Sequence, residues 1–263
     1  MPERRRVAIT VKTYPNPSTK YGETVCIAGV DLALGQMVRL YPIRFRDLPY
    51  EQSFKKWEVV EADMTHKDND ARGDTYTPAP DAPIKTVDAF CKGSGKKTRP
   101  DWSRRDALAL PLARSLEDLQ VRADKFEGSL GLVRVTEDAE FYMQADAPEW
   151  TERQLAIMNQ ESLFGSSRKP LEKIPWKFRY KFRCADSPEC PGHDLQVFDW
   201  EPYELYRGQW HQHGPEKAYR DVLDQYNNRY GTKNRNVHLW VGTTVKYPTQ
   251  FSCVGVYYPP NGG

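Results

Sequence analysis

The sequence has little of what several protein classes require. Five cysteines in 263 residues are too few, and odd in number, for a disulfide framework. No segment approaches the roughly 18 consecutive apolar residues of a membrane span. The apolar run after the basic start, residues 7–11, is too short for a signal peptide. We therefore expect a soluble, cytoplasmic protein.

A strong excess of one charge is also missing. The 38 lysines and arginines against 36 aspartates and glutamates leave a net charge of +2, which excludes a histone-like or basic tail protein. Aromatic residues, in contrast, reach 12%, more than a disordered chain contains. A folded chain of this length buries roughly three quarters of its unfolded surface. We expect a folded protein, in which only the local distribution of charge can indicate a partner.

Short apolar segments bounded by glycine and proline predict β structure in the first part of the chain. We expect strands at residues 6–13, 24–32, 36–43 and 57–65. Strands of this length and spacing are typical of a small barrel. A polar, proline-rich stretch at residues 67–83 is expected to cross the surface as a connector.

The β pattern returns after a helical segment. Capping residues predict helices within 103–123, interrupted near Pro111 and restarted at Ser115. Further strands are expected at 129–135, 141–143, 176–184, 194–199, 237–242 and 249–257, and helices at 150–161, 203–209 and 215–229. We predict a mainly β fold with α insertions (α+β): a small barrel at 1–66, a connector with helices at 67–127, and a second small barrel at 128–263.

Basic residues gather in two segments despite the near-neutral total. In the expected strand at 176–183, Lys177, Arg179, Lys181 and Arg183 alternate with three aromatic residues, so they would line one face. Residues 168–183 hold seven basic residues and one acid, a local charge of +6 that would attract phosphates. The alternative is a solvated face of a half-buried strand, paired with an acidic strand such as 58–63.

Two smaller groups also suit nucleic acid. Lys96 and Lys97 belong to a basic, glycine-containing loop that could clasp a phosphate backbone or be an ordinary solvated loop. Arg39 and Tyr41 share one face of an expected strand and combine a cation with a ring for base stacking. Alternatively, Tyr41 is a core residue and Arg39 a lone surface charge.

The spacing Cys184-x5-Cys190-x2-His193 indicates a metal site. Two thiolates and an imidazole this close in sequence suit Zn²⁺, which takes four tetrahedral N or S ligands in structural sites. The fourth ligand must come from elsewhere, and His211, His213, Cys253 or a carboxylate are candidates. The alternative is a pair of unbonded thiols in a polar turn.

Asp199 and Glu201 allow two interpretations. Carboxylates two residues apart could hold Mg²⁺ for phosphodiester cleavage. The pattern fits a helix start better, with Asp199 as the cap and Pro202 in the first turn. No Ser/His/Asp or Cys/His nucleophile motif is visible, so the chain is expected to be a binding protein rather than an enzyme.

Several short motifs, taken together, resemble a known family. They are Val25-Cys-Ile-Ala-Gly29 with Met37-Val-Arg-Leu-Tyr-Pro42, then Cys184 to His193 with Asp199-Trp-Glu201, then Leu239-Trp-Val-Gly242, Tyr247-Pro248, Phe251 and Val254-Gly-Val-Tyr257-Tyr-Pro259. This set resembles the bacterial dual OB-fold domain family. The resemblance implies two OB-like barrels with connecting helices, and a nucleic-acid role in prokaryotic defence or mobile-element loci. Residues 67–105 lie outside these motifs.

The leading functional hypothesis is a module that binds DNA or RNA through backbone contacts and base stacking. A metal-dependent nuclease or hydrolase using Asp199 and Glu201 is the first alternative. A protein-interaction or nucleotide-sensing subunit of a larger complex is the second.

Overall fold

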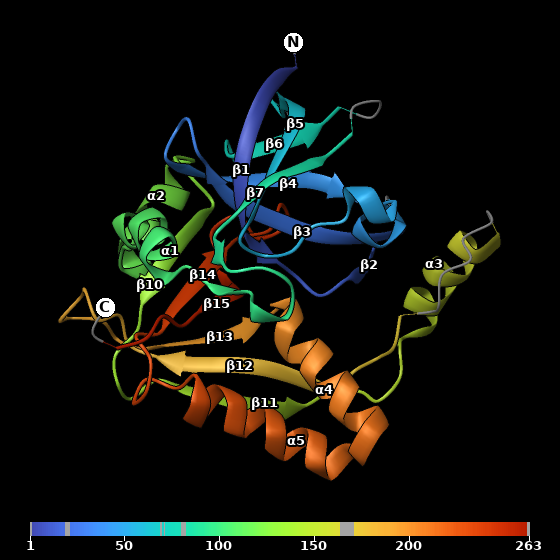
Figure 1. Cartoon of the computed structure of the whole chain (residues 1–263). Coiled ribbons are helices and arrows are strands. Elements are labelled where there is room, and N and C mark those ends of the chain that lie inside the picture. The colour runs from blue at the N-terminus through green and yellow to red at the C-terminus, as the bar shows by residue number, and fades with distance from the viewer. Residues whose placement is uncertain are drawn as a thin grey trace.

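The structure is a computed structural model that describes residues 2–18, 22–68, 70, 72–79, 83–163 and 171–261. Figure 1 shows two β layers stacked one above the other, with helices beside and below them. The N-terminal half forms the upper layer and the C-terminal half the lower one.

Five strands of the N-terminal half close into a β-barrel. They are β1 (Glu3–Lys12), β3 (Gly22–Asp31), β4 (Gln36–Ile43), β5 (Glu58–His66) and β6 (Thr75–Pro78). Antiparallel ladders join β1 to β3, β3 to β4, and β5 to both β1 and β6, and a parallel ladder between β4 and β6 completes the circle. Two further strands, β2 (Asn16–Ser18) and β7 (Lys85–Ala89), pair with β3 and β5. The barrel predicted for this part of the chain is confirmed.

The strand that completes the barrel lies in the segment expected to be a surface connector. β6 has four residues, ends at Pro78 and pairs through only two residues with β4 and three with β5. A proline in so short a strand gives no recognisable strand pattern. Pairing with distant strands, rather than local preference, therefore determines β6.

Strand β1 is buried on both faces. Val7 and Ile9 belong to the barrel interior, whereas Ala8 and Val11 pack outward in a second cluster with residues of the C-terminal half. The pairing of β1 with β3 shifts in register between Ile9 and Val11, and this irregularity changes which side chains point into the barrel and which point outward. This double burial explains why residues 7–11 read as a continuous apolar run rather than an alternating one.

Short elements and two helices follow the barrel. The hairpin of β8 (Cys91–Lys92) and β9 (Arg99–Pro100) leads into α1 (Trp102–Ala109), and α2 (Leu116–Asp124) follows after Pro111. Asp101 caps α1, and the Ser115 hydroxyl accepts a hydrogen bond from the Asp118 N–H at the start of α2, as the sequence predicts. Single 3₁₀ turns are η1 (Phe45–Asp47), η2 (Tyr50–Gln52), η3 (Gly95–Lys97) and η4 (Leu110–Leu112).

Six strands of the C-terminal half form one sheet. Their spatial order is β10 (Leu130–Arg134), β14 (His238–Gly242), β15 (Ser252–Tyr257), β13 (His193–Val197), β12 (Trp176–Phe182) and β11 (Glu140–Ala145). Only β13 and β15 run parallel. A single bridge between Val135 and Cys184 links the ends of β10 and β12, but within the described chain no ladder joins the edge strands β10 and β11. The mainly β fold with helices is thus present, while this half is a sheet without the ladder that would close a barrel.

Helices cover one face of that sheet. α4 (Trp200–His213) and α5 (Pro215–Asp224), extended by the π-turn η5 (Gln225–Arg229), lie below β11–β13 in Figure 1. Tyr203, Tyr206 and Val222 pack against Phe178 and other aromatic side chains of the sheet. α3 (Glu152–Leu163) begins after Thr151, whose hydroxyl accepts a hydrogen bond from the Gln154 N–H, and extends to one side of the molecule. Among the described helices, none is long and apolar enough to cross a membrane.

A shared core joins the two halves. Trp57 and Val11 of the barrel pack in one cluster with Leu132, Trp240 and Tyr257 of the sheet. Nearby, the Tyr14 N–H donates to the Phe198 carbonyl at 2.7 Å. The junction between barrel and sheet is therefore fixed by apolar burial and backbone bonding, and the cavities described next lie along it.

Candidate functional site

A cavity of about 820 Å³ lies at the junction. Its walls come from the barrel, from α3, and from the segment that connects β14 and β15. Four cationic side chains line it: Arg39, Arg72, Arg153 and Lys246. Among the described residues, no carboxylate lines it. We call this space the junction cavity, and its lining favours an anionic ligand.

Arg39 is the most deeply buried of these cations, at 2% exposure. Its Nη1 donates to Cys26 Sγ at 2.8 Å, and its Nη2 donates to Ser129 Oγ at 3.0 Å and to the Thr243 carbonyl at 3.2 Å. Arg39 therefore binds across the junction, from barrel to sheet. The prediction that it is a candidate binding residue stands beside this structural role, and the lone-surface-charge alternative does not fit its burial.

Tyr41 and Arg72 complete the barrel side of the cavity. Tyr41 is half-buried, with Lys67 Nζ 5.1 Å from its ring centroid. Arg72 forms a two-bond ion pair with Asp70, at 2.6 and 2.8 Å. Burial alone would raise the pKa of Asp70, but the hydrogen bonds and charge of Arg72 outweigh it and lower that pKa to about 2. Arg72 is therefore paired with a carboxylate, whereas the side-chain partners of Arg39 are a thiol, a hydroxyl and a carbonyl.

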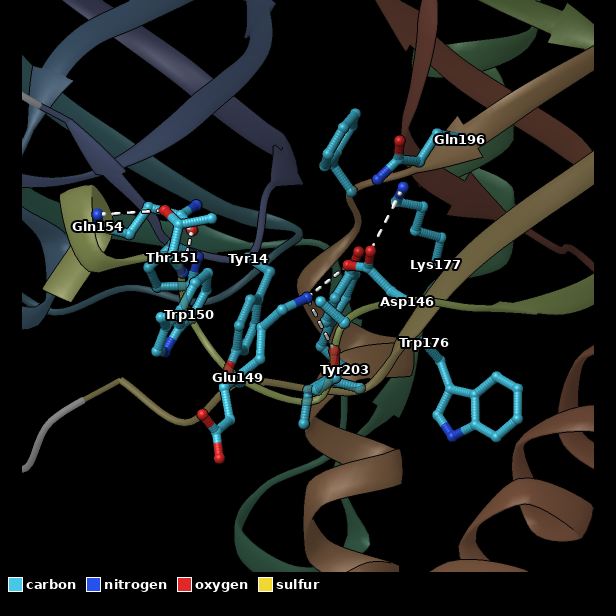
Figure 2. A pocket seen from close by; sticks show the side chains of 15 residues that line it. Tyr14, Asp146, Glu149, Trp150, Thr151, Gln154, Trp176, Lys177, Gln196 and Tyr203 are labelled. Carbon is cyan, nitrogen blue, oxygen red and sulfur yellow. Dashed lines mark hydrogen bonds and ion pairs between the residues drawn. The ribbon is translucent and has the colours of Figure 1, made fainter.

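A second, smaller pocket of about 310 Å³ adjoins the junction cavity, and Figure 2 shows its side chains. The two spaces share Tyr14, Gln154 and Phe198 as lining residues. In the smaller pocket, Tyr14 stacks on Tyr203 with ring centroids 4.5 Å apart. Trp150 adds a third ring. We refer to the two spaces together as the junction groove.

Lys177 is the residue of the predicted basic strand that reaches this groove. Its Nζ lies 3.4 Å from Asp146 Oδ1, and Lys173 forms a closer ion pair with the same carboxylate. Figure 2 shows the side chain of Lys177 directed at the Asp146 carboxylate in the lining of the smaller pocket. The smaller pocket thus sets two lysines against two acids, Asp146 and Glu149, and the excess of positive charge in the groove lies in the junction cavity.

The other basic residues of β12 alternate as predicted but are partly neutralised. Phe178, Tyr180 and Phe182 are buried, whereas Lys181 and Arg183 are exposed. Arg179 donates to Asp194 Oδ1 at 2.9 Å, and Lys181 is in register with Glu140 and Asp194 on the neighbouring strands. Acids of β11 and β13 face this stripe, while residues 58–63 pair with β1 instead. Arg168 and Lys169 of the predicted basic segment lie outside the described residues.

Lys96 and Lys97 lie in η3, away from the groove. Both are exposed, and neither lines the junction cavity or the smaller pocket. Their neighbours in the predicted basic loop have acidic or backbone partners: Lys92 pairs with Asp101, Arg104 with Asp88, and Arg105 donates to the Phe90 carbonyl.

A candidate metal cluster lies on the C-terminal sheet. Glu117, Cys184, Cys190 and His193 each offer one ligand atom, and these atoms lie within 4.8 Å of one another. Cys190 Sγ is 3.2 Å from His193 Nε2, which is 2.9 Å from Glu117 Oε1. Ligands of a tetrahedral zinc ion are roughly 3.3–3.8 Å apart, because each bond is roughly 2.0–2.3 Å long. The three residues predicted from spacing therefore lie together. Small changes in the distances between the four ligand atoms would bring them to those of a tetrahedral zinc site.

Glu117 is the member of the cluster that the sequence could indicate only as an unspecified carboxylate. It stands in the first turn of α2, where a carboxylate is favoured by the helix dipole. Desolvation raises the pKa of Glu117, but hydrogen bonds from its own backbone, Cys190 and His193 lower it to about 2. Burial raises the pKa of the Cys184 thiol, whose sulfur accepts a hydrogen bond from the Leu116 N–H.

The other expected fourth ligands lie elsewhere. His211 pairs with Glu172, and Cys253 is fully buried in β15, where its thiol faces the Gly255 carbonyl. His213 lies at the C-terminal end of α4. The structure does not bring these three candidates into the cluster, because strands and helices hold them apart from the turn between β12 and β13.

Asp199 and Glu201 form a helix start. The Asp199 carboxylate accepts hydrogen bonds from the Glu201 and Val256 N–H groups and pairs with Lys56 Nζ at 3.0 Å. It is fully buried. Desolvation lowers the pKa of Lys56, but the charge of Asp199 outweighs it and the net shift is upward. Both Asp199 oxygens are thus occupied, as the capping interpretation predicts.

The fold and site define a β-barrel protein joined to a helix-covered sheet, with a cationic groove at the junction. Residues 112–262 match the model of a family described as "Domain of unknown function (DUF8757)", and residues 3–111 match "Domain of unknown function (DUF8758)". Because the first match covers more than half of the chain, the protein belongs to the DUF8757 family. No curated protein matches the sequence. The two matched regions meet within the turn η4, between α1 and α2.

Proposed function

We propose that this protein binds a single strand of DNA or RNA along the junction groove. The observation that carries the proposal is the lining of that groove, where Arg39, Arg153, Lys246 and Lys177 accompany half-buried aromatic side chains. Cations that track a phosphate backbone and rings that stack on bases are the two elements of single-strand recognition.

The barrel side of the groove supports the same function. We propose that the closed five-stranded barrel is of the OB type, whose second and third strands form the binding face for oligonucleotides. Here these strands are β3 and β4, and they supply Cys26, Arg39 and Tyr41 to the junction cavity. A second OB-like barrel in the C-terminal half, a role in prokaryotic defence and a protein partner remain part of this proposal.

A salt titration tests the function. A fluorescent oligonucleotide would be titrated with the protein at about 50 and 200 mM salt. If the groove neutralises three or four phosphates, affinity should fall roughly 20- to 50-fold between those conditions. Absent binding to both DNA and RNA, or binding that salt does not change, would contradict the proposal.

We also propose that Glu117, Cys184, Cys190 and His193 hold a structural Zn²⁺. Two sulfurs, one imidazole nitrogen and one carboxylate oxygen complete a closed four-ligand set, which leaves no position for a reactive water. Such an ion would join α2 to the turn between β12 and β13. Elemental analysis of protein purified without chelator should give about one zinc per chain. A metal-free protein with unchanged stability would contradict this assignment.

The nuclease alternative is not favoured. Asp199 is buried and engaged by Lys56 and two backbone N–H groups, so it cannot also hold a catalytic Mg²⁺ without losing the helix start.

A further inference from the structure

The junction cavity contains a buried cation without a counterion. Arg39 forms no ion pair with any described residue, and its Nε has no hydrogen-bond partner. Its side-chain bonds go to a thiol, a hydroxyl and a carbonyl, none of which is a carboxylate. The Arg39 N–H donates to the Asp74 carbonyl, but the guanidinium is linked to the Asp74 carboxylate only through Ser129, whose hydroxyl donates to that carboxylate at 2.7 Å. Burying a guanidinium without a counterion lowers the stability of the folded state, and a bound anion would offset this loss.

The remaining lining supplies more positive charge than Arg39 alone. Arg72 is balanced by Asp70, but Arg153 on α3 and Lys246 after β14 are exposed at the rim. The buried Thr243 hydroxyl has no hydrogen-bond partner among the described residues, and it lies beside the carbonyl that accepts from Arg39. A buried polar group without a partner calls for an explanation, and a bound ligand group at this position would supply one.

The cavity is not purely polar. Tyr41, Ile157, Phe198 and Val254 also line it, and its volume of about 820 Å³ exceeds what a bare inorganic anion fills. A ligand that satisfies both parts of the lining carries a doubly charged group at one end and a flat, weakly polar ring at the other.

We propose that the junction cavity binds a phosphate monoester attached to a nucleoside. The source is either the phosphorylated end of a strand or a free mononucleotide. In the first case the inference rests on the proposed function and deepens it. A monoester carries about −1.5 to −2 charge at neutral pH, whereas an internal phosphodiester carries one, so a convergent arginine site discriminates between them.

The geometry assigns distinct tasks to the residues. Arg39 and the Thr243 hydroxyl contact the phosphate from the buried end. Arg153 and Lys246 contact the phosphate from the rim of the cavity, and Tyr41 and Phe198 flank the base. This arrangement predicts that the preference for a phosphorylated end depends on Arg39 and Thr243, while overall affinity depends on Arg153 and Lys246.

The test compares four probes in direct binding titrations. These are an oligonucleotide with a terminal phosphate at either end, the same strand with hydroxyl ends, a hydroxyl-ended strand one nucleotide longer, and a nucleoside monophosphate. The longer strand matches the number of phosphates, with the additional one internal and singly charged. We expect the phosphorylated strand to bind about tenfold more tightly than both hydroxyl-ended strands, because one end gains charge-assisted hydrogen bonds.

Two variants address the buried end. Arg39→Gln should abolish the preference for the phosphorylated strand, but Arg39 also bonds across the junction, so its thermal melt must be checked. Thr243→Val removes only an unpartnered hydroxyl and keeps the carbonyl, so it should fold normally. We expect it to reduce the preference for the phosphorylated strand several-fold.

The outcomes separate this inference from the proposed function. Equal binding of phosphorylated and hydroxyl-ended strands by the wild-type protein would overturn end recognition and leave strand binding standing. Binding of the nucleoside monophosphate alone, lost in Arg39→Gln, would support the cavity site and contradict strand binding. Binding of no probe would overturn both. A preference that survives in Thr243→Val and in a folded Arg39→Gln would overturn the assigned residues.

Discussion

At the scale of single residues, three buried charged groups near the junction differ in how they are balanced. Arg72 has Asp70, Lys56 has Asp199, and Arg39 has only neutral partners. Breaking a buried pair leaves an uncompensated charge and costs several kcal/mol. We therefore expect the first two groups to serve stability, and we propose an anion as the missing counterion of Arg39, which also bonds across the junction.

The Asp70–Arg72 pair makes stability depend on acid. Replacing Asp70 with Asn should lower the free energy of unfolding at neutral pH by about 2–3 kcal/mol, as judged by urea denaturation. The folded-state pKa of Asp70 is depressed to about 2, below its unfolded value. Its contribution is therefore complete above the unfolded pKa and is lost as pH falls from about 4 to 2.

The control for this variant is Asp68→Asn, because the Asp68 side chain is 94% exposed. That change should stay within about 0.5 kcal/mol of the wild-type protein. Equal stabilities of Asp70→Asn and Asp68→Asn across the acid range would show that the Asp70–Arg72 pair contributes nothing.

Asp199 should behave as a structural residue. Asp199→Ala removes the cap of α4 and leaves Lys56 buried without its main partner, so we expect a loss of about 3–5 kcal/mol of stability. Glu201→Gln, whose side chain is 41% exposed, should cost less than about 1 kcal/mol. Thermal melts of the two variants provide the measurement. A stable Asp199→Ala protein that loses a metal-dependent cleavage activity would restore the nuclease hypothesis.

At the scale of elements, the candidate metal cluster connects α2 to the turn between β12 and β13. Leu116 and Leu119 of α2 already pack in the C-terminal core, so the helix is held by apolar contacts as well. A metal ion would add a link that chelators can remove.

The matched pair Glu117→Gln and Glu127→Gln tests this link. Glu117 is in the cluster, whereas Glu127 is exposed on the segment after α2. We expect Glu117→Gln to lose zinc at least tenfold more readily to a competing chelator, and Glu127→Gln to match the wild-type protein. Identical zinc retention in the two variants would remove Glu117 from the ligand set.

Local sequence patterns predicted most elements of the fold. The alternation of β12, the caps at Ser115, Thr151 and Asp199, and the break near Pro111 all follow from side-chain periodicity and capping chemistry. β6 could not be predicted, because its pairing with β4 and β5 depends on strands distant in sequence. The same limit applies to Glu117, which lies 67 residues before the first cysteine of the cluster.

At the scale of the whole molecule, the barrel and the sheet share a core and enclose the groove between them. Arg39 and Tyr41 were predictable from a cation and a ring on one strand face, and Lys177 from the basic stripe. That they line two adjoining pockets, together with Arg153 and Lys246, follows only from the junction of the two halves. Lys96 and Lys97 were also predicted from a basic pattern, but they line neither pocket of this groove.

The most direct test of the account removes two rim cations of the junction cavity. In Arg153→Ala/Lys246→Ala, both changed side chains are exposed, so the fold should be unaffected. The control, Lys125→Ala/Lys233→Ala, removes the same charge from exposed positions that line neither part of the groove. The account predicts that the rim variant binds a single-stranded oligonucleotide at least about tenfold more weakly, with a salt slope smaller by about 1.4, while the control stays within about twofold of the wild-type protein. Equal affinities and equal salt slopes for the two variants would contradict binding in the junction groove.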